Sequence, residues 1–200
     1  MKSVILILNE DDAKLTDTLT SIDADVDICI VNKKDTNEKT KAMSNILVNN
    51  CCGDSAEYSE EFYINGVIKK KYSDKKTYTY IEVNSDIEDL AEQGLKVLSV
   101  SYDVILLTNK NTIYKAGAID KMLSKFNSPK IGFVYSDGII NNEVNTLGLV
   151  DIMVDNEIPI KNYAVRSNLV DQYKKNPFFF ALECFNKNII SHIPEYLYKT

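Results

Sequence analysis

Apolar residues in the first part of the chain form short runs separated by a segment with helical spacing. Val4–Leu8 is a continuous apolar run and Val26–Val31 a nearly continuous one, as is typical of strands buried on both faces of a sheet. Between them, Leu15, Leu19 and Ile22 recur at the spacing of one helix face. This order predicts a parallel α/β sheet with right-handed crossovers. A second helix is expected around Met43, Ile46 and Leu47.

The same alternation continues further along the chain. Three more strands are predicted at Tyr78–Val83, Val104–Leu107 and Ile131–Tyr135. Ser136-Asp137-Gly138 predicts a turn after the last of them, because Asp and Gly are common turn residues. We therefore expect one α/β domain over residues 1–200, with a mostly parallel central sheet flanked by helices. Helices are also expected around Leu90–Leu98, Ile119–Phe126 and Phe179–Asn186.

One segment interrupts this alternation. Phe62–Ile68 contains Asn65-Gly66 between apolar residues, and Asn-Gly fills a tight turn that needs positive φ angles. This pattern predicts a β-hairpin, inserted at about residues 50–76 and lying at the rim of the sheet.

Composition and charge narrow the class of protein. Two hundred residues, 44% hydrophobic and 26% charged, fit one soluble globular domain. The net charge of −6 argues against general nucleic-acid binding, which usually needs a basic face. No apolar run is long enough to span a bilayer, so a soluble, cytoplasmic protein is expected. Zinc-site spacing is absent from the four cysteines, Cys29, Cys51, Cys52 and Cys184.

Several motifs occur in a characteristic order and together cover nearly the whole chain. They begin with SVILILNEDDAKLTDTLTSI at Ser3–Ile22, followed by VDICIVNKKDTN at Val26–Asn37 and NSDIEDLAEQGL at Asn84–Leu95. IGFVYSD at Ile131–Asp137 and HIPEYLYK at His192–Lys199 come later. In this order the chain resembles the family-2 glycosyltransferases of the GT-A fold. The resemblance implies a nucleotide-sugar donor and a GT-A-like sheet.

The chain departs from the family at its functional positions. The family places metal-binding aspartates in the loop after the fourth strand, and this loop is Thr108-Asn109-Lys110-Asn111 here. Neutral side chains are poor ligands for Mg²⁺ or Mn²⁺, and a lysine repels the ion. The family's base-binding aspartate region is Asn32-Lys33-Lys34. We therefore expect no divalent metal cofactor.

The candidate substrate-binding residues follow predicted parallel strands, where open α/β sheets bind their ligands. Lys33 and Lys110 are expected to hold the donor diphosphate in place of a metal. Asp137 and Glu183 are the candidate catalytic carboxylates on the acceptor side, with Glu183 in a segment similar to the family's general-base motif. Arg166, the only arginine, is expected to form a surface ion pair. The complete set of candidate substrate-binding residues is Asn9, Asn32, Lys33, Asn84, Thr108, Asn109, Lys110 and Asn111.

Three functions fit these residues. The first is metal-independent transfer of a sugar from a nucleotide-sugar donor to an unknown acceptor. The second is a non-catalytic GT-A-like module that binds a protein partner or is a structural component of a larger assembly, such as a viral one. The third is a nucleotidyltransferase, which is disfavoured because Asn9-Glu10-Asp11-Asp12 has no glycine to cradle phosphates. An open cleft lined by both Lys33 and Lys110 would favour the first.

Overall fold

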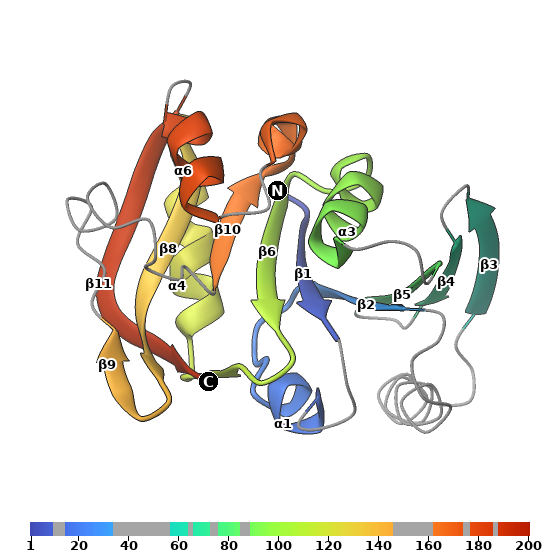
Figure 1. Cartoon of the computed structure of the whole chain (residues 1–200), viewed down its shortest axis with the longest axis horizontal. Coiled ribbons are helices and arrows are strands. Elements are labelled where there is room, and N and C mark those ends of the chain that lie inside the picture. The colour runs from blue at the N-terminus through green and yellow to red at the C-terminus, as the bar shows by residue number, and fades with distance from the viewer. Residues whose placement is uncertain are drawn as a thin grey trace.

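A single mixed β-sheet forms the centre of the computed structural model, with helices on both faces (Figure 1). The structure describes residues 1–9, 15–33, 57–63, 66–72, 76–84, 89–145, 162–173, 177–185 and 188–200. The strands within these ranges are β1 (Ser3–Leu8), β2 (Asp27–Lys33), β3 (Glu57–Tyr63), β4 (Gly66–Tyr72), β5 (Thr77–Val83), β6 (Val104–Asn109), β7 (Ile113–Tyr114), β8 (Ile131–Ile140), β9 (Glu143–Asn145), β10 (Tyr163–Arg166) and β11 (Ile189–Lys199).

The strand order is β3-β4-β5-β2-β1-β6-β10-β8-β11-β7, and β9 pairs with β8. Strands β5, β2, β1 and β6 run parallel, β8 and β11 are parallel to each other, and β10 is antiparallel to both β6 and β8. The sheet is therefore mostly parallel at its centre, as the apolar runs predict. The helices are α1 (Leu15–Thr20), α3 (Leu90–Ser99), α4 (Ala118–Ser124) and α6 (Pro177–Phe185), with 3-10 helices η1 (Lys125–Asn127) and η2 (Ser167–Gln172).

Each face of the sheet carries its own apolar cluster. The first cluster combines α3, η2 and α6 with side chains such as Leu6 and Leu107, and we call this side of the sheet face A. The second combines α1 and α4 with side chains such as Ile7 and Leu106, and we call this side face B. Helix α3 approaches β1 closely at Gly94, where a Cβ atom would lie 2.6 Å from a methyl carbon of Leu6. Burial of both faces explains why the central strands are continuous apolar runs.

The predicted hairpin is present at the rim of the sheet. Strands β3 and β4 are antiparallel and pair Tyr63 with Gly66, and β4 in turn pairs with β5. A Cβ atom on Gly66 would lie 1.9 Å from the carbonyl oxygen of Glu82, so β5 approaches too closely for any other residue. This contact therefore requires a glycine at position 66.

The predicted turn at Ser136–Gly138 is wrong, because β8 continues through these residues to Ile140. Gly138 is required for a different reason: the ring of Tyr198 packs on the backbone there, 2.4 Å from where a Cβ atom would lie. The chain reverses at Asn141 and Asn142, whose φ angles of 52° and 65° are both left-handed. Consecutive left-handed residues suit a two-residue hairpin connection, here into β9.

The expectation that Arg166 forms a surface ion pair is also wrong. Its Nε donates to the carbonyl of Ile131 at 2.8 Å, and its Nη2 donates to the carbonyls of Phe126 and Ser128 at 2.7 and 3.0 Å. The guanidinium also lies 5.4 Å from the centre of the Phe126 ring. Arg166 therefore joins the end of β10 to η1 and to the start of β8.

Two expectations fall on residues outside the described ranges. These are the helix around Met43, Ile46 and Leu47, and the neighbouring pair Cys51 and Cys52. The other two cysteines, Cys29 and Cys184, are buried free thiols. The limits of the domain, residues 1–200, stay a prediction.

We expect Arg166→Lys to lower the free energy of unfolding by about 2–4 kcal/mol. A lysine has no planar fork to reach three carbonyls, and hydrogen bonds from charged donors contribute ~1.5–3 kcal/mol each. The melting temperature should fall by roughly 4–16 °C for a domain of this size. Differential scanning fluorimetry checks this. Lys121→Met, which removes only an exposed ion pair with Glu195, is the control and should change stability by less than ~1 kcal/mol. Equal, small effects in both variants would contradict this role of Arg166.

Candidate functional site

The candidate residues gather where four parallel strands end. Asn9 follows β1, Lys33 is the last residue of β2, Asn84 follows β5 and Asn109 ends β6. The ladder continues slightly beyond the strands, since the amide of Asn9 donates to Val31 at 3.0 Å and that of Lys110 donates to Leu8 at 3.2 Å. The carboxyl edge of an open α/β sheet is its usual ligand site.

Strand alternation divides these residues between the two faces. Leu8 pairs with both Val31 and Asn109, so these three side chains share face A. Lys33, two residues after Val31, lies on the same face. Lys110, one residue after Asn109, is assigned to face B. The register therefore does not direct the Lys33 and Lys110 side chains to one face, although their strands are both neighbours of β1.

Asn32 is buried and bonded within the protein. Its side-chain amide lies 2.7 Å from the hydroxyl of Tyr80 on β5. In the orientation that satisfies both ends, its oxygen accepts from Tyr80 and its nitrogen donates to the carbonyls of Asn9 at 2.9 Å and Val31 at 3.1 Å. The side-chain amide of Asn9 is 2.8 Å away. These contacts hold the ends of β1, β2 and β5 together on face B.

Lys110 is also largely enclosed. The residue is 7% exposed, and its side-chain nitrogen is inaccessible to solvent. Its carbonyl accepts a hydrogen bond from the Thr18 hydroxyl, which ties the loop after β6 to α1. In this conformation the ammonium group of Lys110 is not accessible to a donor diphosphate bound at the surface.

A polar cluster that the sequence did not indicate surrounds Asn162. The side-chain oxygen of Asn162 contacts the hydroxyls of Thr108, Thr112 at 3.4 Å and Tyr114 at 3.3 Å. Burial raises the pKa of Tyr114 well above its ordinary value, and it raises that of Tyr198, whose hydroxyl bonds Asn162, to about 12. Thr108, expected in the loop after the fourth strand, lies in β6 instead and bonds Asn162 inside face B. A buried asparagine before a short strand has no signal in a single sequence.

Asp137 lies inside β8 and forms a close pair with His192 of β11. The His192 Nε2 atom is 2.7 Å from Asp137 Oδ1, and the side chains are 19% and 5% exposed respectively. The imidazole stacks on the ring of Tyr135, with centroids 4.7 Å apart and planes 12° from parallel. Asp137 is thus a strand residue, although the sequence pattern predicted a turn at this position.

Glu183 lies elsewhere in the fold. It is exposed on α6, one residue before Cys184, whose carbonyl accepts from the amide of Asn188. Asn188 precedes the pairing of Ile189 with Ile131 at the amino end of β8. Six residues of strand, about 20 Å, separate Ile131 from Asp137. Figure 1 shows α6 beside the amino-terminal part of β8, away from β9. The two candidate carboxylates are therefore not brought together.

The remaining candidates are Asn84, which is half-buried, and Asn111, which is exposed in the loop before β7. Within the described ranges, no group of three or more His, Cys, Asp and Glu side chains is arranged to hold a metal ion. None of the described helices is long and apolar enough to cross a membrane.

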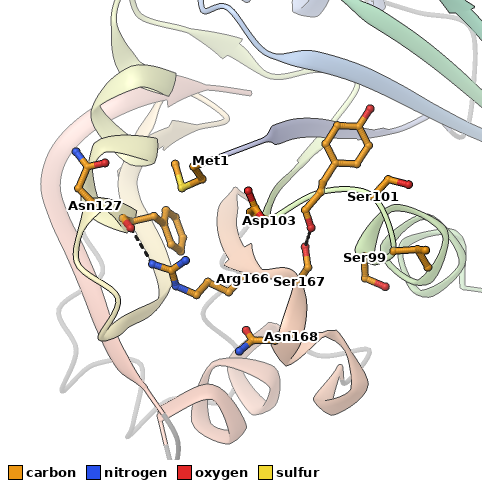
Figure 2. A pocket seen from close by; sticks show the side chains of 11 residues that line it. Met1, Ser99, Ser101, Asp103, Asn127, Arg166, Ser167 and Asn168 are labelled. Carbon is orange, nitrogen blue, oxygen red and sulfur yellow. Dashed lines mark hydrogen bonds between the residues drawn. The ribbon is translucent and has the colours of Figure 1, made fainter.

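A cavity of about 710 Å³ lies at the opposite, amino-terminal edge of the sheet (Figure 2). The end of α3, the start of β6, η1 and the start of η2 surround it. Arg166 and Asp103 line it, but both are already hydrogen-bonded within the protein. The Asp103 carboxylate accepts from the amide of Lys2, and the Arg166 guanidinium donates to the carbonyl of Phe126 in η1. The Ser167 hydroxyl donates to the Tyr102 carbonyl. The polar groups drawn in Figure 2 thus largely join neighbouring segments of the chain.

Comparison with known sequences identifies no relative. No protein-family model matches the chain, and no curated protein matches it.

Comparison with solved structures shows the fold. The crystal structure of S. aureus TarS 1-349 aligns with a TM-score of 0.64 at 9% identity, and covers 100% of this chain and 60% of that chain. Its complex with UDP-GlcNAc aligns with a TM-score of 0.65 at 11% identity, over 100% and 58%. The 4-diphosphocytidyl-2C-methyl-D-erythritol synthase from Anaerococcus prevotii aligns with a TM-score of 0.54 at 13% identity, over 98% and 88%.

These likenesses define the class of fold. TarS is a GT-A glycosyltransferase and the synthase a nucleotidyltransferase. The chain has a GT-A-like fold of the nucleotide-diphospho-sugar transferase type, as the sequence resemblance implied. It spans about 60% of the TarS 1-349 chain that it matches.

The buried tyrosines predict a loss of stability in alkali. In the unfolded chain the Tyr198 hydroxyl has a pKa near 10, whereas burial in the folded protein raises this pKa to about 12. The stabilisation is therefore fully present below pH 10 and is lost as the pH rises to 12. Urea unfolding at pH 9 to 12 should show a fall in unfolding free energy, to which Tyr198 contributes on the order of 2 kcal/mol. Tyr198→Phe should reduce the slope, and an unchanged slope would contradict the burial of this hydroxyl.

Proposed function

We propose that this protein binds a nucleotide sugar at the carboxyl edge of its sheet and transfers the sugar to an acceptor without a divalent metal. The observation that carries this proposal is the position of Lys33, Asn109 and Asp137 on face A, at the edge where open α/β sheets bind ligands. The GT-A-like fold supports the same class of substrate, and TarS, which shares it, has been crystallised with UDP-GlcNAc.

In the proposed complex Lys33 supplies the positive charge toward the donor diphosphate. It lies at the end of β2 and is half-buried, so its side chain is accessible, in contrast to that of Lys110. Asn109, on the neighbouring strand β6, is also half-buried and can bond sugar or phosphate oxygens. Lysine binds phosphate as a point charge and needs no metal to do so. The departing nucleoside diphosphate is stabilised by this charge as the glycosidic bond breaks.

The second candidate function is a non-catalytic GT-A-like module that binds a protein partner. Its support is the burial of Asn32, Thr108 and Lys110, which stand at or near positions that bind donor or metal in the related family. Asn32 and Thr108 bond other residues of this chain, through Tyr80 and Asn162. Donor binding separates the two functions.

A thermal-shift screen against UDP-, GDP-, ADP-, CMP- and dTDP-sugars, each with Mn²⁺ and with EDTA, tests this. A donor at ~100 times its dissociation constant adds about 2.7 kcal/mol, and the melting temperature should rise by roughly 5–10 °C. We expect one donor class to give this shift equally with EDTA. A shift that needs Mn²⁺ would contradict the metal-free mode. Absence of any shift would favour the protein-binding module.

Lys33→Ala should weaken binding of the donor found in that screen by about 10- to 150-fold, because one charge-assisted contact contributes ~1.5–3 kcal/mol. Isothermal titration calorimetry gives both dissociation constants. Lys130→Ala is the matched control, because this exposed lysine precedes β8 at the opposite edge of the sheet. If the two variants bind equally well, Lys33 does not contact the donor.

A further inference from the structure

His192 has the environment of a base rather than of a packing residue. It is the only histidine of the chain. Asp137 holds one ring nitrogen at 2.7 Å, Tyr135 holds the ring plane by stacking, and the side chain is 19% exposed. The imidazole is therefore fixed in orientation while part of it reaches the surface.

The partner of Nε2 determines where the imidazole can accept a proton. An ionised carboxylate only accepts hydrogen bonds, so the neutral imidazole must carry its proton on Nε2 when it is bonded to Asp137. The lone pair then lies on Nδ1. Within the described part of the chain, Nδ1 has no hydrogen-bond partner. A carboxylate that orients one nitrogen leaves the other free to act as a base.

The sheet register brings this pair toward the proposed donor site. Tyr163 of β10 pairs with Leu107 on one side and with Tyr135 on the other, so these three residues lie at one level on face A. Asn109 comes two residues after Leu107 on β6, and Asp137 comes two residues after Tyr135 on β8. Strands β6 and β8 run in the same direction, because both are antiparallel to β10. Asn109 and Asp137 therefore share a level and a face, two strand spacings or about 10 Å apart.

We propose that His192, oriented by Asp137, is the general base of the transfer reaction; this rests on the proposed function. Nδ1 removes the proton of the acceptor hydroxyl as its oxygen forms a bond to the anomeric carbon. The bond from that carbon to the donor phosphate breaks, and its electron pair leaves with the nucleoside diphosphate. The imidazolium is stabilised by the Asp137 carboxylate and later releases its proton to solvent.

The position of Glu183 supports this assignment. The base must lie within hydrogen-bond reach of the acceptor hydroxyl, which is bound at the carboxyl edge with the donor. Glu183 is exposed on α6 near the amino end of β8, about 20 Å along the strand from the level of Asp137. Asp137 acts through the imidazole and is a positioning residue.

The test measures nucleoside diphosphate release by the full chain, with water as acceptor and with each sugar nucleotide of the screen as donor. His192→Gln should lower the turnover rate by at least ~100-fold with unchanged donor affinity, since a general base contributes 10²–10⁴-fold. Asp137→Asn should lower it by at least ~10-fold. Asp171→Asn, which changes an exposed carboxylate of η2, is the control and should leave both quantities unchanged.

A second measurement avoids any effect of substitution on folding. Diethyl pyrocarbonate modifies the single histidine of the native chain, and hydroxylamine removes the group. Turnover should disappear and return while the donor-induced thermal shift persists. In ¹⁵N-histidine NMR spectra, the one imidazole should show a protonated Nε2, and Asp137→Asn should change this pattern.

The outcomes separate the two proposals. Donor binding and turnover that survive both His192→Gln and modification would overturn the base and leave the proposed function standing. Donor binding without turnover in the unmodified chain would overturn the base and favour the binding module. If no sugar nucleotide binds the unmodified chain, the proposed function fails and the base role fails with it.

Discussion

Strand β1 is hydrogen-bonded on both sides, to β2 and to β6, and four of its six residues are at most 1% exposed. Between Val4 and Leu8 this strand carries only apolar side chains, and the next polar residue is Asn9. The backbone groups at the end of β1 still need partners, and the amides of Asn9 and Lys110 find them in the neighbouring strands. The central strand thus aligns the ends of its neighbours at the edge where the candidate residues lie.

The two faces of that edge have different properties. On face B, polar side chains are buried, and a buried polar group without a partner costs about 1–3 kcal/mol. Asn32 and Thr108 accordingly bond Tyr80 and Asn162. On face A, Lys33 and Asn109 remain half-buried, and His192 is partly exposed. Groups on face A are therefore more accessible to a ligand than the buried groups on face B.

Much of the fold could be predicted from the sequence, because apolar runs and helical spacing report directly which segments are buried. The hairpin around Gly66 was predictable for the same kind of reason, since Asn-Gly is a local turn signal. The turn predicted at Gly138 was wrong, because this glycine makes room for a side chain instead. The ring of Tyr198, 60 residues later in the sequence, packs where a Cβ atom would otherwise lie. Glycine has the same sequence signal in a turn and in a close contact.

The candidate site was less predictable than the fold. The positions of Lys33 and Lys110 after parallel strands suggested a common role, but only the register assigns them to opposite faces. The Asn162 cluster and the pair of Asp137 with His192 join residues 48 to 55 positions apart, mostly through side chains. A single sequence carries no record of such contacts. The predicted absence of a metal stays a prediction.

Strand β11 supplies both His192 and Tyr198, and it follows every other described strand in the sequence. During synthesis the nascent chain can therefore pair β1, β2, β5 and β6 before β11 has left the ribosome. The Asp137–His192 pair spans 55 residues and forms only when β11 docks alongside β8. Contacts of such long sequence separation form slowly, because the intervening loop must close first. The order of translation thus places completion of the candidate site after the pairing of the central strands β1, β2, β5 and β6.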